Sequence, residues 1–367
     1  MPDPYRVAVI GRTGKGAYGH GIDTVWAEVP RTKIVAVADD DKMGLAEAAR
    51  RLGVDAAFSD YRRMLDEVKP DIVAIGPRWI DQHRDMAVAA ADRGMHIYME
   101  KPFCRTLAEA DEIVAACERT HARLAIAHQT RYSPMIAVVR QIVDSGRLGR
   151  VMEYRGRGKE DHRGGGEDLW VLGTHVVDLI RTFGGHPLWC QASVAQNGRP
   201  ISSADVVEGP EGIGPLAGDA VHAMYGMPDG SAAYFSSVRA TGGKIARFGL
   251  HIHGSGGIVE ILSGHLPSVK FLEDPSWSPG RSGAEWQNVS SAGVGVPEPL
   301  SDGGLHAGNV AAVNDLLAAI EENRQPLGSA YEARGATEMI VAAFESQRLG
   351  ARVPLPLENR QNPLTML

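Results

Sequence analysis

The chain opens with the stretch RVAVIGRTGKGAYGH at residues 6–20, in which a short β-branched run leads directly into glycines. A glycine turn between a first strand and a first helix lets backbone amides approach a pyrophosphate at the positive end of that helix. The spacing departs from GxGxxG, because Thr13 replaces the second glycine or because one residue is inserted before Gly14. The stretch therefore predicts a dinucleotide-binding start. The residues expected at the phosphates are Gly11, Thr13, Gly14 and Gly16.

Four more apolar runs follow the first one, at residues 33–38, 71–75, 95–99 and 123–127. Near-continuous apolar runs of this length are typical of parallel strands that are buried on both faces. Alanine-rich segments with helical spacing lie between them, for example at 44–52 and 81–93, and the box Thr106-Leu107-Ala108-Glu109 predicts a helix start. The first third of the chain is thus predicted to be a Rossmann-type α/β domain over residues 1–128.

The pattern changes after about residue 128. A helix is predicted over 135–145 and two more at about 306–321 and 331–348. Between them lie strand-like segments near 151–157, 188–195, 220–225, 231–239, 246–253 and 257–262. Many strands joined by short turns predict an α+β domain over residues 129–367, with an open, mainly antiparallel sheet exposed on one face. We expect this domain to bind substrate and to form the oligomer interface.

Composition narrows the class of protein. A net charge of −7 argues against a nucleic-acid binder, and 44% hydrophobic residues allow two ordinary globular cores. The cysteines Cys104, Cys117 and Cys190 have no CxxC spacing, which fits a reducing compartment better than a disulfide framework. No apolar run approaches the ~20 residues of a membrane span, and no signal-peptide pattern precedes the first strand. We therefore expect a cytoplasmic protein without a membrane partner.

Asp39 stands directly after the second predicted strand, at the distance expected for an acid that holds the ribose 2′-hydroxyl of a dinucleotide. It is the first of three successive carboxylates at residues 39–41, which a 2′-phosphate would have to face. The sequence therefore predicts NAD as the cofactor in preference to NADP. Arg12 and Lys15 are cations of the glycine loop that would be able to neutralise a phosphate, so activity with both cofactors tests the assignment.

The segment Glu100-Lys101-Pro102 closes the fourth predicted strand and resembles the signature of the glucose–fructose oxidoreductase / inositol dehydrogenase / rhizopine-catabolism (Gfo/Idh/MocA) family. Other stretches resemble that family in the same order along the chain. They are Gly76-Pro77 with His83, Arg131-Tyr132-Ser133-Pro134, Asp144 to Gly149, Gly173-Thr174-His175-Val176-Val177-Asp178, and Ser346 to Leu357. The resemblance covers essentially the whole chain, and its specificity comes from the ordered series rather than from one tripeptide.

This resemblance implies an NAD-dependent oxidoreductase acting on CH–OH groups. Removal of a hydride from a secondary alcohol requires a base within hydrogen-bond reach of the hydroxyl. Carried over from the family, Lys101 orients the hydroxyl and stabilises alkoxide charge, and His175 accepts the proton. Pro77, His83 and Glu100, together with Lys101, lie on the cofactor side of the family's site. The Lys101–Pro102 bond is often cis in relatives. The resemblance also implies that the protein forms a homodimer or a homotetramer.

One position departs from the family pattern. The family usually carries Asp four residues before the histidine, one helical turn away, and this chain has Val171 there. Valine cannot bind a sugar hydroxyl or orient the imidazole, so another group takes this role or the chemistry differs. Asp168 lies seven residues before His175 and shares its helical face if the helix begins there; the alternative is a helix N-cap.

Three other residues complete the expected substrate contacts: Arg131, His162 and Trp170. Trp170 has two interpretations, a sugar-stacking surface or a core residue. His162 lies among acidic residues in the 160–168 segment, but the spacing fits no recognised metal-ligand pattern, so we expect a loop over the substrate and no metal.

Three functions remain open from the sequence. The leading one is an NAD-dependent dehydrogenase for a secondary hydroxyl of a sugar, glycoside or cyclitol. The second is a redox-neutral glycosidase or lyase that acts through a transient 3-keto sugar, which the Val171 position and the 160–168 segment motivate. The third is a non-enzymatic NAD sensor, against which the retained Lys101 and His175 count.

Overall fold

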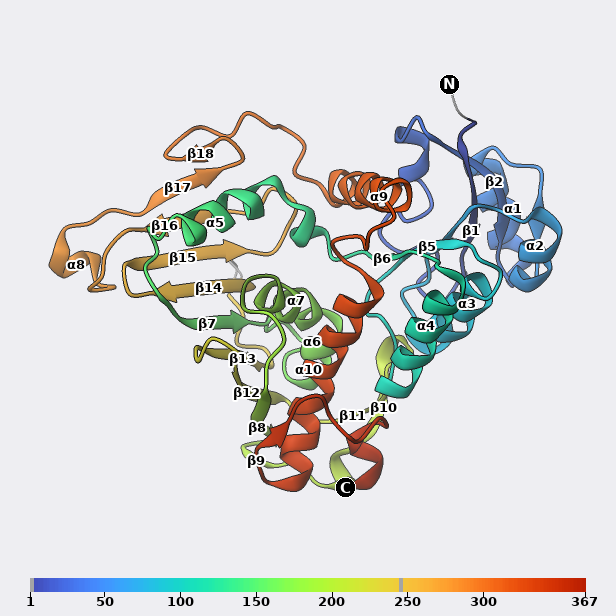
Figure 1. The fold of residues 1–367 in the computed structure, drawn as a ribbon. Coiled ribbons are helices and arrows are strands. Elements are labelled where there is room, and N and C mark those ends of the chain that lie inside the picture. The colour runs from blue at the N-terminus through green and yellow to red at the C-terminus, as the bar shows by residue number, and fades with distance from the viewer. Residues whose placement is uncertain (1–2, 244–246) are drawn as a thin grey trace. The chain divides into compact units, whose positions relative to one another are not determined.

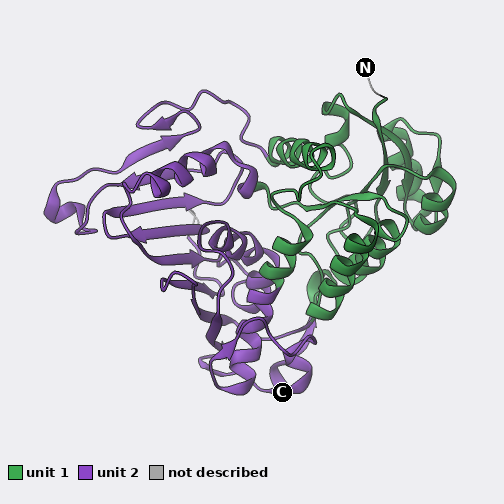
Figure 2. Ribbon diagram, in the orientation of Figure 1, with its two compact units in different colours: residues 1–129, 209–214, 305–337 green, residues 130–208, 215–304, 338–367 purple. Residues whose placement is uncertain are grey.

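The computed structural model describes residues 3–243 and 247–367. Its contacts divide the chain into two units, which Figure 2 colours separately. Unit 1 comprises residues 1–129, 209–214 and 305–337, and unit 2 comprises residues 130–208, 215–304 and 338–367. Residues 209–214 and 305–337, which the sequence assigned to the second domain, therefore group with the first unit.

Unit 1 is built on a six-stranded sheet in the order β3-β2-β1-β4-β5-β6, and every pairing in it is parallel. This order is that of a Rossmann-type fold, so the predicted class is confirmed. The five apolar runs form five of the strands, because residues such as Val7, Val73 and Ile97 are fully buried. The strands are β1 (Tyr5–Ile10), β2 (Thr32–Ala38), β3 (Ala57–Phe58), β4 (Ile72–Ile75), β5 (His96–Met99) and β6 (Leu124–Ile126).

Helices follow most of the strands of this sheet in the sequence and pack beside it, as Figure 1 shows. Two of the predicted helices are confirmed within a few residues, and α2 was not predicted. The α4 start is also confirmed, because the Thr106 hydroxyl accepts a hydrogen bond from the Glu109 amide at 3.2 Å. Unit 1 contains α1 (Lys42–Leu52), α2 (Tyr61–Val68), α3 (His83–Ala91), α4 (Leu107–Thr120) and α9 (Leu305–Glu321), with the 3₁₀ turns η1 (Val25–Glu28), η2 (Ile80–Gln82) and η5 (Pro210–Gly212).

The expected first helix after the glycine loop is wrong. Residues 11–24 form successive turns, and only the 3₁₀ turn η1 precedes β2. The reason is backbone conformation: Gly14, Gly16, Gly19 and Gly21 all have φ between +64° and +84°, outside the right-handed helical region. The glycine loop therefore does not sit on a helix N-terminus.

Unit 2 contains an eleven-stranded sheet in the order β18-β17-β16-β15-β14-β7-β13-β12-β8-β19, with β9 pairing to β8. Among the described strands of this sheet, only β7 and β13 pair in parallel, so the predicted mainly antiparallel sheet is confirmed. Its strands are β7 (Val151–Arg157), β8 (Trp189–Gln196), β9 (Arg199–Pro200), β12 (Ala220–Gly226), β13 (Ala232–Val238), β14 (Gly249–Gly254), β15 (Gly257–Leu262), β16 (Val269–Leu272), β17 (Gln287–Ser290), β18 (Gly293–Val294) and β19 (Val353–Pro354). The segment predicted at 246–253 begins outside the described residues.

Helix α7 packs closely against this sheet. A Cβ at Gly156 of β7 would lie 2.6 Å from Val176 of the helix, so glycine is required for this approach. The remaining elements are α5 (Pro134–Asp144), α6 (Gly166–Val171), α7 (Gly173–Gly184), α8 (Pro279–Ser282), the turns η3 (Gln129–Tyr132), η4 (Ser203–Asp205) and η6 (Pro363–Met366), and a separate pair of strands, β10 (Val207–Gly209) and β11 (Gly214–Leu216). Helix α10 (Ala330–Leu349) begins in unit 1 and ends in unit 2.

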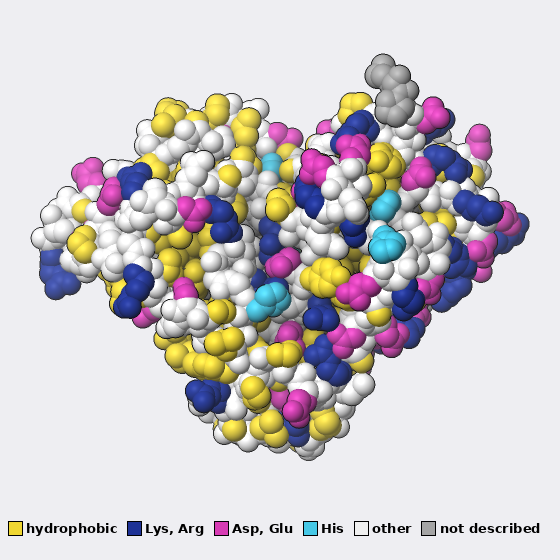
Figure 3. All heavy atoms as spheres, viewed as in Figure 1, with side chains coloured by type: hydrophobic (Ala, Val, Ile, Leu, Met, Phe, Trp, Pro, Cys, Tyr) yellow, Lys and Arg dark blue, Asp and Glu magenta, His cyan; other side chains and the backbone are white. Residues whose placement is uncertain are grey.

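The surface carries mixed charge. Figure 3 shows basic and acidic side chains interspersed on the face in view. Pairs such as Arg93–Asp66 and Arg119–Asp92 account for part of this mixing in unit 1. Among the helices of residues 3–243 and 247–367, no stretch has the length and hydropathy that a bilayer crossing requires.

Candidate active site

The glycine loop is closed by its own hydrogen bonds. The amides of Arg12 and Ala17 exchange hydrogen bonds with each other's carbonyls at 3.1 and 2.9 Å. The Tyr18 ring packs directly on Gly11, where a Cβ would lie 2.2 Å from the ring, so this glycine is required by a side chain of the loop itself. Within the part of the chain that the structure describes, the amides of Gly14 and Gly16 donate no hydrogen bond. They are the donors that this loop offers to a phosphate.

Asp39 is the acceptor that holds the loop together. Its carboxylate accepts hydrogen bonds from the Thr13 amide at 3.1 Å, the Thr13 hydroxyl at 2.8 Å and the Tyr18 hydroxyl at 2.9 Å. The Asp41 amide donates a further one at 3.0 Å, and Asp39 is only 2% exposed. Burial of the Tyr18 phenol, followed by the negative charge of Asp39, raises the Tyr18 pKa well above the usual range, so Tyr18 stays a donor. Asp39 thus joins the glycine loop to the end of β2.

Both cations of the glycine loop have partners in unit 1. The Arg12 guanidinium lies 2.8 Å from Asp81 and 3.9 Å from Asp40. The Lys15 ammonium lies 3.9 Å from the centre of the Trp79 ring, in a cation–π contact. The two cations therefore already interact with acids or an aromatic ring, and three carboxylates, residues 39–41, follow β2. This arrangement favours NAD over a cofactor with a 2′-phosphate.

Glu100 organises the end of β5. One of its oxygens accepts from the His20 amide at 3.0 Å and contacts the His20 ring, and the other accepts from the Lys101 amide at 2.8 Å. Glu100 is fully buried, which alone would raise its pKa, but the hydrogen bond from His20 and the charge of Lys101 lower it below the usual value. The carboxylate is therefore an anion beside Lys101, which is 6% exposed, and the Lys101–Pro102 bond is cis as the resemblance implied.

Asn309 of α9, from a distant part of the sequence, holds the glycine loop at His20. Its amide nitrogen donates to the His20 carbonyl at 2.8 Å. Its side-chain oxygen accepts from the Tyr98 hydroxyl at 2.8 Å and from Gln129 at 3.0 Å. The chain Gln129–Asn309–His20–Glu100 thus leads to the backbone of Lys101 and belongs entirely to unit 1.

His83 joins two strand ends rather than offering its ring to a ligand. Its Nε2 lies 2.7 Å from the Pro77 carbonyl oxygen, and its Nδ1 lies 2.9 Å from the Pro102 carbonyl oxygen. The ring is completely buried, and burial lowers its pKa despite these carbonyl contacts. The prediction of a direct cofactor contact is therefore replaced by a positioning role for the loops that follow β4 and β5.

His175 lies in the first turn of α7, in unit 2. It is 9% exposed, and its ring makes an edge contact with Phe248 at 6.4 Å between centroids. Helices α6 and α7 meet at Leu172, whose φ of −119° interrupts the helical repeat. Asp168 therefore does not share a continuous helical face with His175, and it is not an N-cap either, since Gly165 precedes α6. Val171, at the position of the family's aspartate, is buried at 4% exposure. Its side chain carries no polar atom that could take the role of that aspartate.

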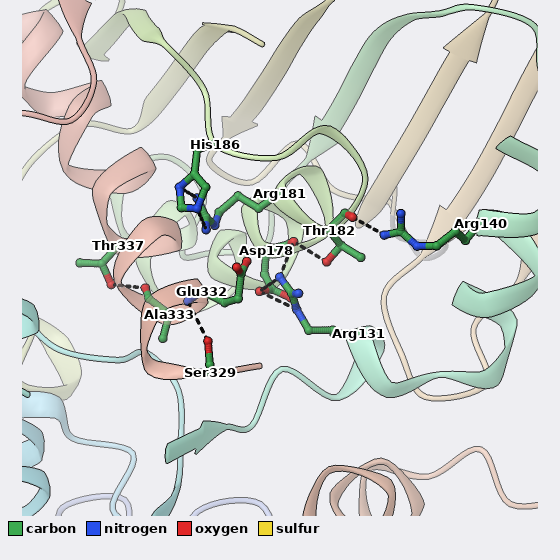
Figure 4. A network of polar contacts seen from close by, with 10 residues as sticks. All are labelled: Arg131, Arg140, Asp178, Arg181, Thr182, His186, Ser329, Glu332, Ala333 and Thr337. Carbon is green, nitrogen blue, oxygen red and sulfur yellow. Dashed lines mark hydrogen bonds and ion pairs between the residues drawn. The ribbon is translucent and has the colours of Figure 1, made fainter. Parts of the chain in front are cut away.

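Arg131 is bound by an acid of the same unit, as Figure 4 shows. Its guanidinium donates to the two carboxylate oxygens of Asp178 at 2.7 and 2.9 Å, and both side chains are almost fully buried. Bidentate pairs of this kind fix orientation. Asp178 lies three residues after His175 on α7, so Arg131 anchors the helix that carries His175 instead of offering its cation to a substrate.

The 160–168 segment is held by Asp168. One oxygen of Asp168 accepts from the Ser237 hydroxyl at 2.5 Å and from the Glu160 amide at 2.9 Å, and the residue is completely buried. The other oxygen has no hydrogen-bond partner among the described residues, and burial raises the Asp168 pKa. Trp170 is a core residue at 2% exposure. Of the predicted substrate contacts in this segment, only the His162 side chain, 86% exposed, is open to solvent.

The structure thus places Gly11, Thr13, Asp39, Glu100 and Lys101 together at the carboxyl edge of the unit 1 sheet, where α/β sheets bind ligands. His175, Arg131, Asp168 and Trp170 belong to unit 2. Sequence reasoning missed His20, Tyr18 and Asn309, because their partners lie far away in sequence. Within residues 3–243 and 247–367, no group of three or more His, Cys, Asp or Glu is arranged to hold a metal ion.

The residues of unit 1 fit a dinucleotide. The amides of Gly14 and Gly16 suit phosphate oxygens, and a cavity of about 150 Å³ lies against Gly11, Arg12, Asp39 and Asp40. The strand order also places this edge at the point where chain connections diverge to either side of β1.

Comparison with known proteins identifies the two parts of the chain. Residues 5–128 match the model of the oxidoreductase family with the NAD-binding Rossmann fold, and residues 136–260 match the GFO/IDH/MocA C-terminal domain. A levoglucosan dehydrogenase of Pseudarthrobacter phenanthrenivorans is 27% identical over 256 residues, 63% of this chain and 65% of that protein. The NAD⁺-dependent scyllo-inositol 2-dehydrogenase of Bacillus subtilis is 24% identical, over 67% of each chain. These alignments span about two thirds of the relatives' own lengths.

Solved structures extend the likeness over the whole fold. A levoglucosan dehydrogenase in complex with NADH and levoglucosan has a TM-score of 0.78 at 22% identity, covering 97% of this chain and 100% of that one. The WlbA dehydrogenase of Bordetella pertussis, in complex with NADH and UDP-GlcNAcA, has a TM-score of 0.71 at 18% identity over 98% and 99%. The chain therefore belongs to the Gfo/Idh/MocA family of oxidoreductases, and its Rossmann domain is the NAD-binding domain of that family.

Proposed function

We propose that the chain is an NAD-dependent dehydrogenase that oxidises a secondary hydroxyl of a sugar, a glycoside or a cyclitol. The observation that carries this proposal is Lys101, a nearly buried residue at the end of β5 in the NAD-binding unit, whose backbone amide donates a hydrogen bond to the Glu100 carboxylate. A fixed cation of this kind stabilises oxygen as negative charge develops on it. The named activities of the relatives, toward levoglucosan and scyllo-inositol, support the substrate class.

The proposed mechanism removes two hydrogens from the substrate. NAD, when bound, supplies the acceptor for the hydride that leaves the carbon. Lys101 donates a hydrogen bond to the hydroxyl oxygen, which orients it and stabilises the developing alkoxide. His175 accepts the hydroxyl proton and passes it to water. The product is the corresponding ketone.

His175 and Lys101 carry the proton chemistry without a neighbouring aspartate. Val171 occupies that position, and Asp168 and Asp178 are engaged by Ser237 and Arg131. Asp161 is likewise paired with Arg163 at 2.7 Å. We infer that the substrate lacks a contact made in other family members, and that His162 of the 160–168 segment supplies a polar contact from the open loop.

A substrate panel tests this function directly. Purified protein would be mixed with NAD and with levoglucosan, inositols, free sugars and aryl glycosides, and reduced nicotinamide would be followed by its absorbance. The proposal expects reduction of NAD with at least one CH–OH substrate and formation of a ketone. Tight NAD binding with no reduction by any compound would instead indicate a sensor.

Val171 and the 160–168 segment favour a second candidate, a redox-neutral glycosidase or lyase. Such an enzyme oxidises the sugar at C3, eliminates the aglycone and returns the hydride, so no reduced nicotinamide accumulates. Release of the aglycone from an aryl glycoside without net reduction of NAD would support it. Cleavage by protein freed of NAD would exclude it.

We also propose a cytoplasmic homodimer or homotetramer that associates through the open sheet of unit 2. Small and uncharged side chains on that sheet support this arrangement, for example Ala220, Ala232 and Ser236, which are half-buried. Light scattering of the purified chain tests it: a mass of two or four chains is expected, and a monomer at micromolar concentration would contradict it.

A further inference from the structure

Asp39, the expected ribose ligand, has no acceptor capacity left. A carboxylate offers about four lone-pair sites. Oδ1 of Asp39 accepts from the amides of Thr13 and Asp41 at 3.1 and 3.0 Å. Oδ2 accepts from the hydroxyls of Thr13 and Tyr18 at 2.8 and 2.9 Å. A ribose diol would have to displace one of these donors from a residue that is 2% exposed, and would thereby open the glycine loop.

Asp40 has the opposite surroundings. Its side chain is 65% exposed, and its only ion-pair contact among the described residues is the Arg12 Nε at 3.9 Å, beyond hydrogen-bond distance. No hydrogen bond within residues 3–243 and 247–367 ends on its carboxylate. Both oxygens can therefore accept from a ligand without disturbing the fold.

Asp40 also lines a cavity, which Asp39 borders as well. The cavity has a volume of about 150 Å³, and Ile10, Ala38 and Met86 give it apolar walls beside the Tyr61 ring. Such walls suit a flat heterocycle, and the polar groups at the same cavity suit an attached sugar. We propose that Asp40, and not Asp39, accepts the hydrogen bonds of the adenosine ribose of NAD and sets the preference for NAD over NADP.

The charge arrangement explains the preference. A 2′-phosphate bound at this position would meet the Asp40 carboxylate, and the nearby Arg12 is held by Asp81 at 2.8 Å. Like charges at short range disfavour binding, whereas two ribose hydroxyls satisfy the same carboxylate. Asp39 then has a different function, which is to tie Thr13 and Tyr18 to the end of β2.

The two adjacent aspartates provide matched variants for the test. Dissociation constants for NAD and NADP would be measured by calorimetry for wild type, Asp40→Ala and Asp39→Asn, together with the melting temperature of each protein. For Asp40→Ala we expect NAD binding weakened about tenfold or more, the effect of one lost hydrogen bond to a charged group. We expect NADP binding to be unchanged or tighter, and the melting temperature to be unchanged.

For Asp39→Asn we expect a lower melting temperature with the ratio of NAD to NADP affinity preserved. If that variant does not fold, Tyr18→Phe frees one acceptor site of Asp39 and is expected to preserve the ratio as well. The proposal is overturned if Asp40→Ala keeps the wild-type ratio, or if the Asp39 or Tyr18 variant loses it. The inference rests on the proposed function only in taking NAD as the cofactor: wild type that binds NAD but oxidises no substrate would contradict the dehydrogenase and not this assignment.

Discussion

Glu100 in unit 1 and Asp168 in unit 2 are both completely buried carboxylates, yet their pKa values shift in opposite directions. Glu100 receives hydrogen bonds on both oxygens and lies beside Lys101, so its pKa is lowered. Asp168 receives donors on one oxygen only, and burial raises its pKa. The difference shows that burial alone does not make a catalytic acid: the first carboxylate positions a cation, and the second fastens a loop.

The largest effect is expected at the cation that Glu100 positions. Lys101→Met is expected to lower kcat/KM by about a thousandfold, because the substrate oxygen loses a fixed donor and a positive charge. NAD affinity measured by calorimetry is expected to change much less. Lys101→Arg is the matched control, which keeps the charge but not the geometry. Equal kcat/KM in wild type and Lys101→Met would contradict the role of Lys101.

The next effect is expected at Glu100 itself. Glu100→Gln keeps the shape of the side chain but weakens its hold on His20 and Lys101, and a small misplacement of a catalytic group costs about a hundredfold in kcat/KM. His20→Gln is the companion variant, since it removes the imidazole from the same oxygen. A Glu100→Gln enzyme with wild-type kcat/KM would show that Lys101 needs no support from this carboxylate.

Asp168 is expected to affect stability rather than catalysis. Asp168→Ala leaves the Ser237 hydroxyl and the Glu160 amide without their acceptor, which is expected to lower the free energy of unfolding by about 2 kcal/mol. Urea denaturation measures this, with Asp168→Asn as the control that retains an acceptor oxygen. A loss of activity in Asp168→Asn comparable to that of Lys101→Met would show that Asp168 acts in catalysis.

The smallest effect concerns the pH dependence of stability. Because the Glu100 pKa is lowered by folding, its contribution is present above the unfolded value of about 4.3 and is lost as the pH falls. Because folding raises the Asp168 pKa, the contribution of Asp168 to the free energy of unfolding is present in acid. It is lost as the pH rises through the pKa of Asp168 in the folded protein. The stability difference between wild type and Glu100→Gln should therefore shrink in acid, and that for Asp168→Asn should shrink toward neutral pH. If both stability differences changed with pH in the same direction, the opposite pKa shifts of Glu100 and Asp168 would be contradicted.

The local patterns predicted much of unit 1. Apolar runs located five strands, and the Glu100-Lys101-Pro102 segment located the edge where Lys101 lies. The glycine loop was recognised, but its turns were not, because four left-handed glycines exclude the expected helix. The saturation of Asp39 depends on Tyr18, whose ring position follows from packing on Gly11 rather than from spacing.

Contacts between distant residues set the limit of the sequence analysis. Asn309 donates a hydrogen bond to His20, which lies 289 positions earlier in the sequence. Residues 305–337 belong to unit 1, which no local sequence pattern predicts. In unit 2, Arg131 and Asp168 have the residue types of substrate ligands, yet both are used internally. Charge and spacing suggested their chemistry, and only the fold determined their partners.

Product stoichiometry shows whether this chain performs net hydride transfer from a CH–OH group with Lys101 at the reacting oxygen. Wild type and Lys101→Met would be incubated with NAD and the best substrate of the panel, and reduced nicotinamide and ketone would be quantified together. We expect one reduced nicotinamide for each ketone in wild type, and about a thousandfold slower formation of both products in the variant, with NAD still bound. Substrate consumption without reduced nicotinamide, or equal rates of product formation by both proteins, would contradict this expectation.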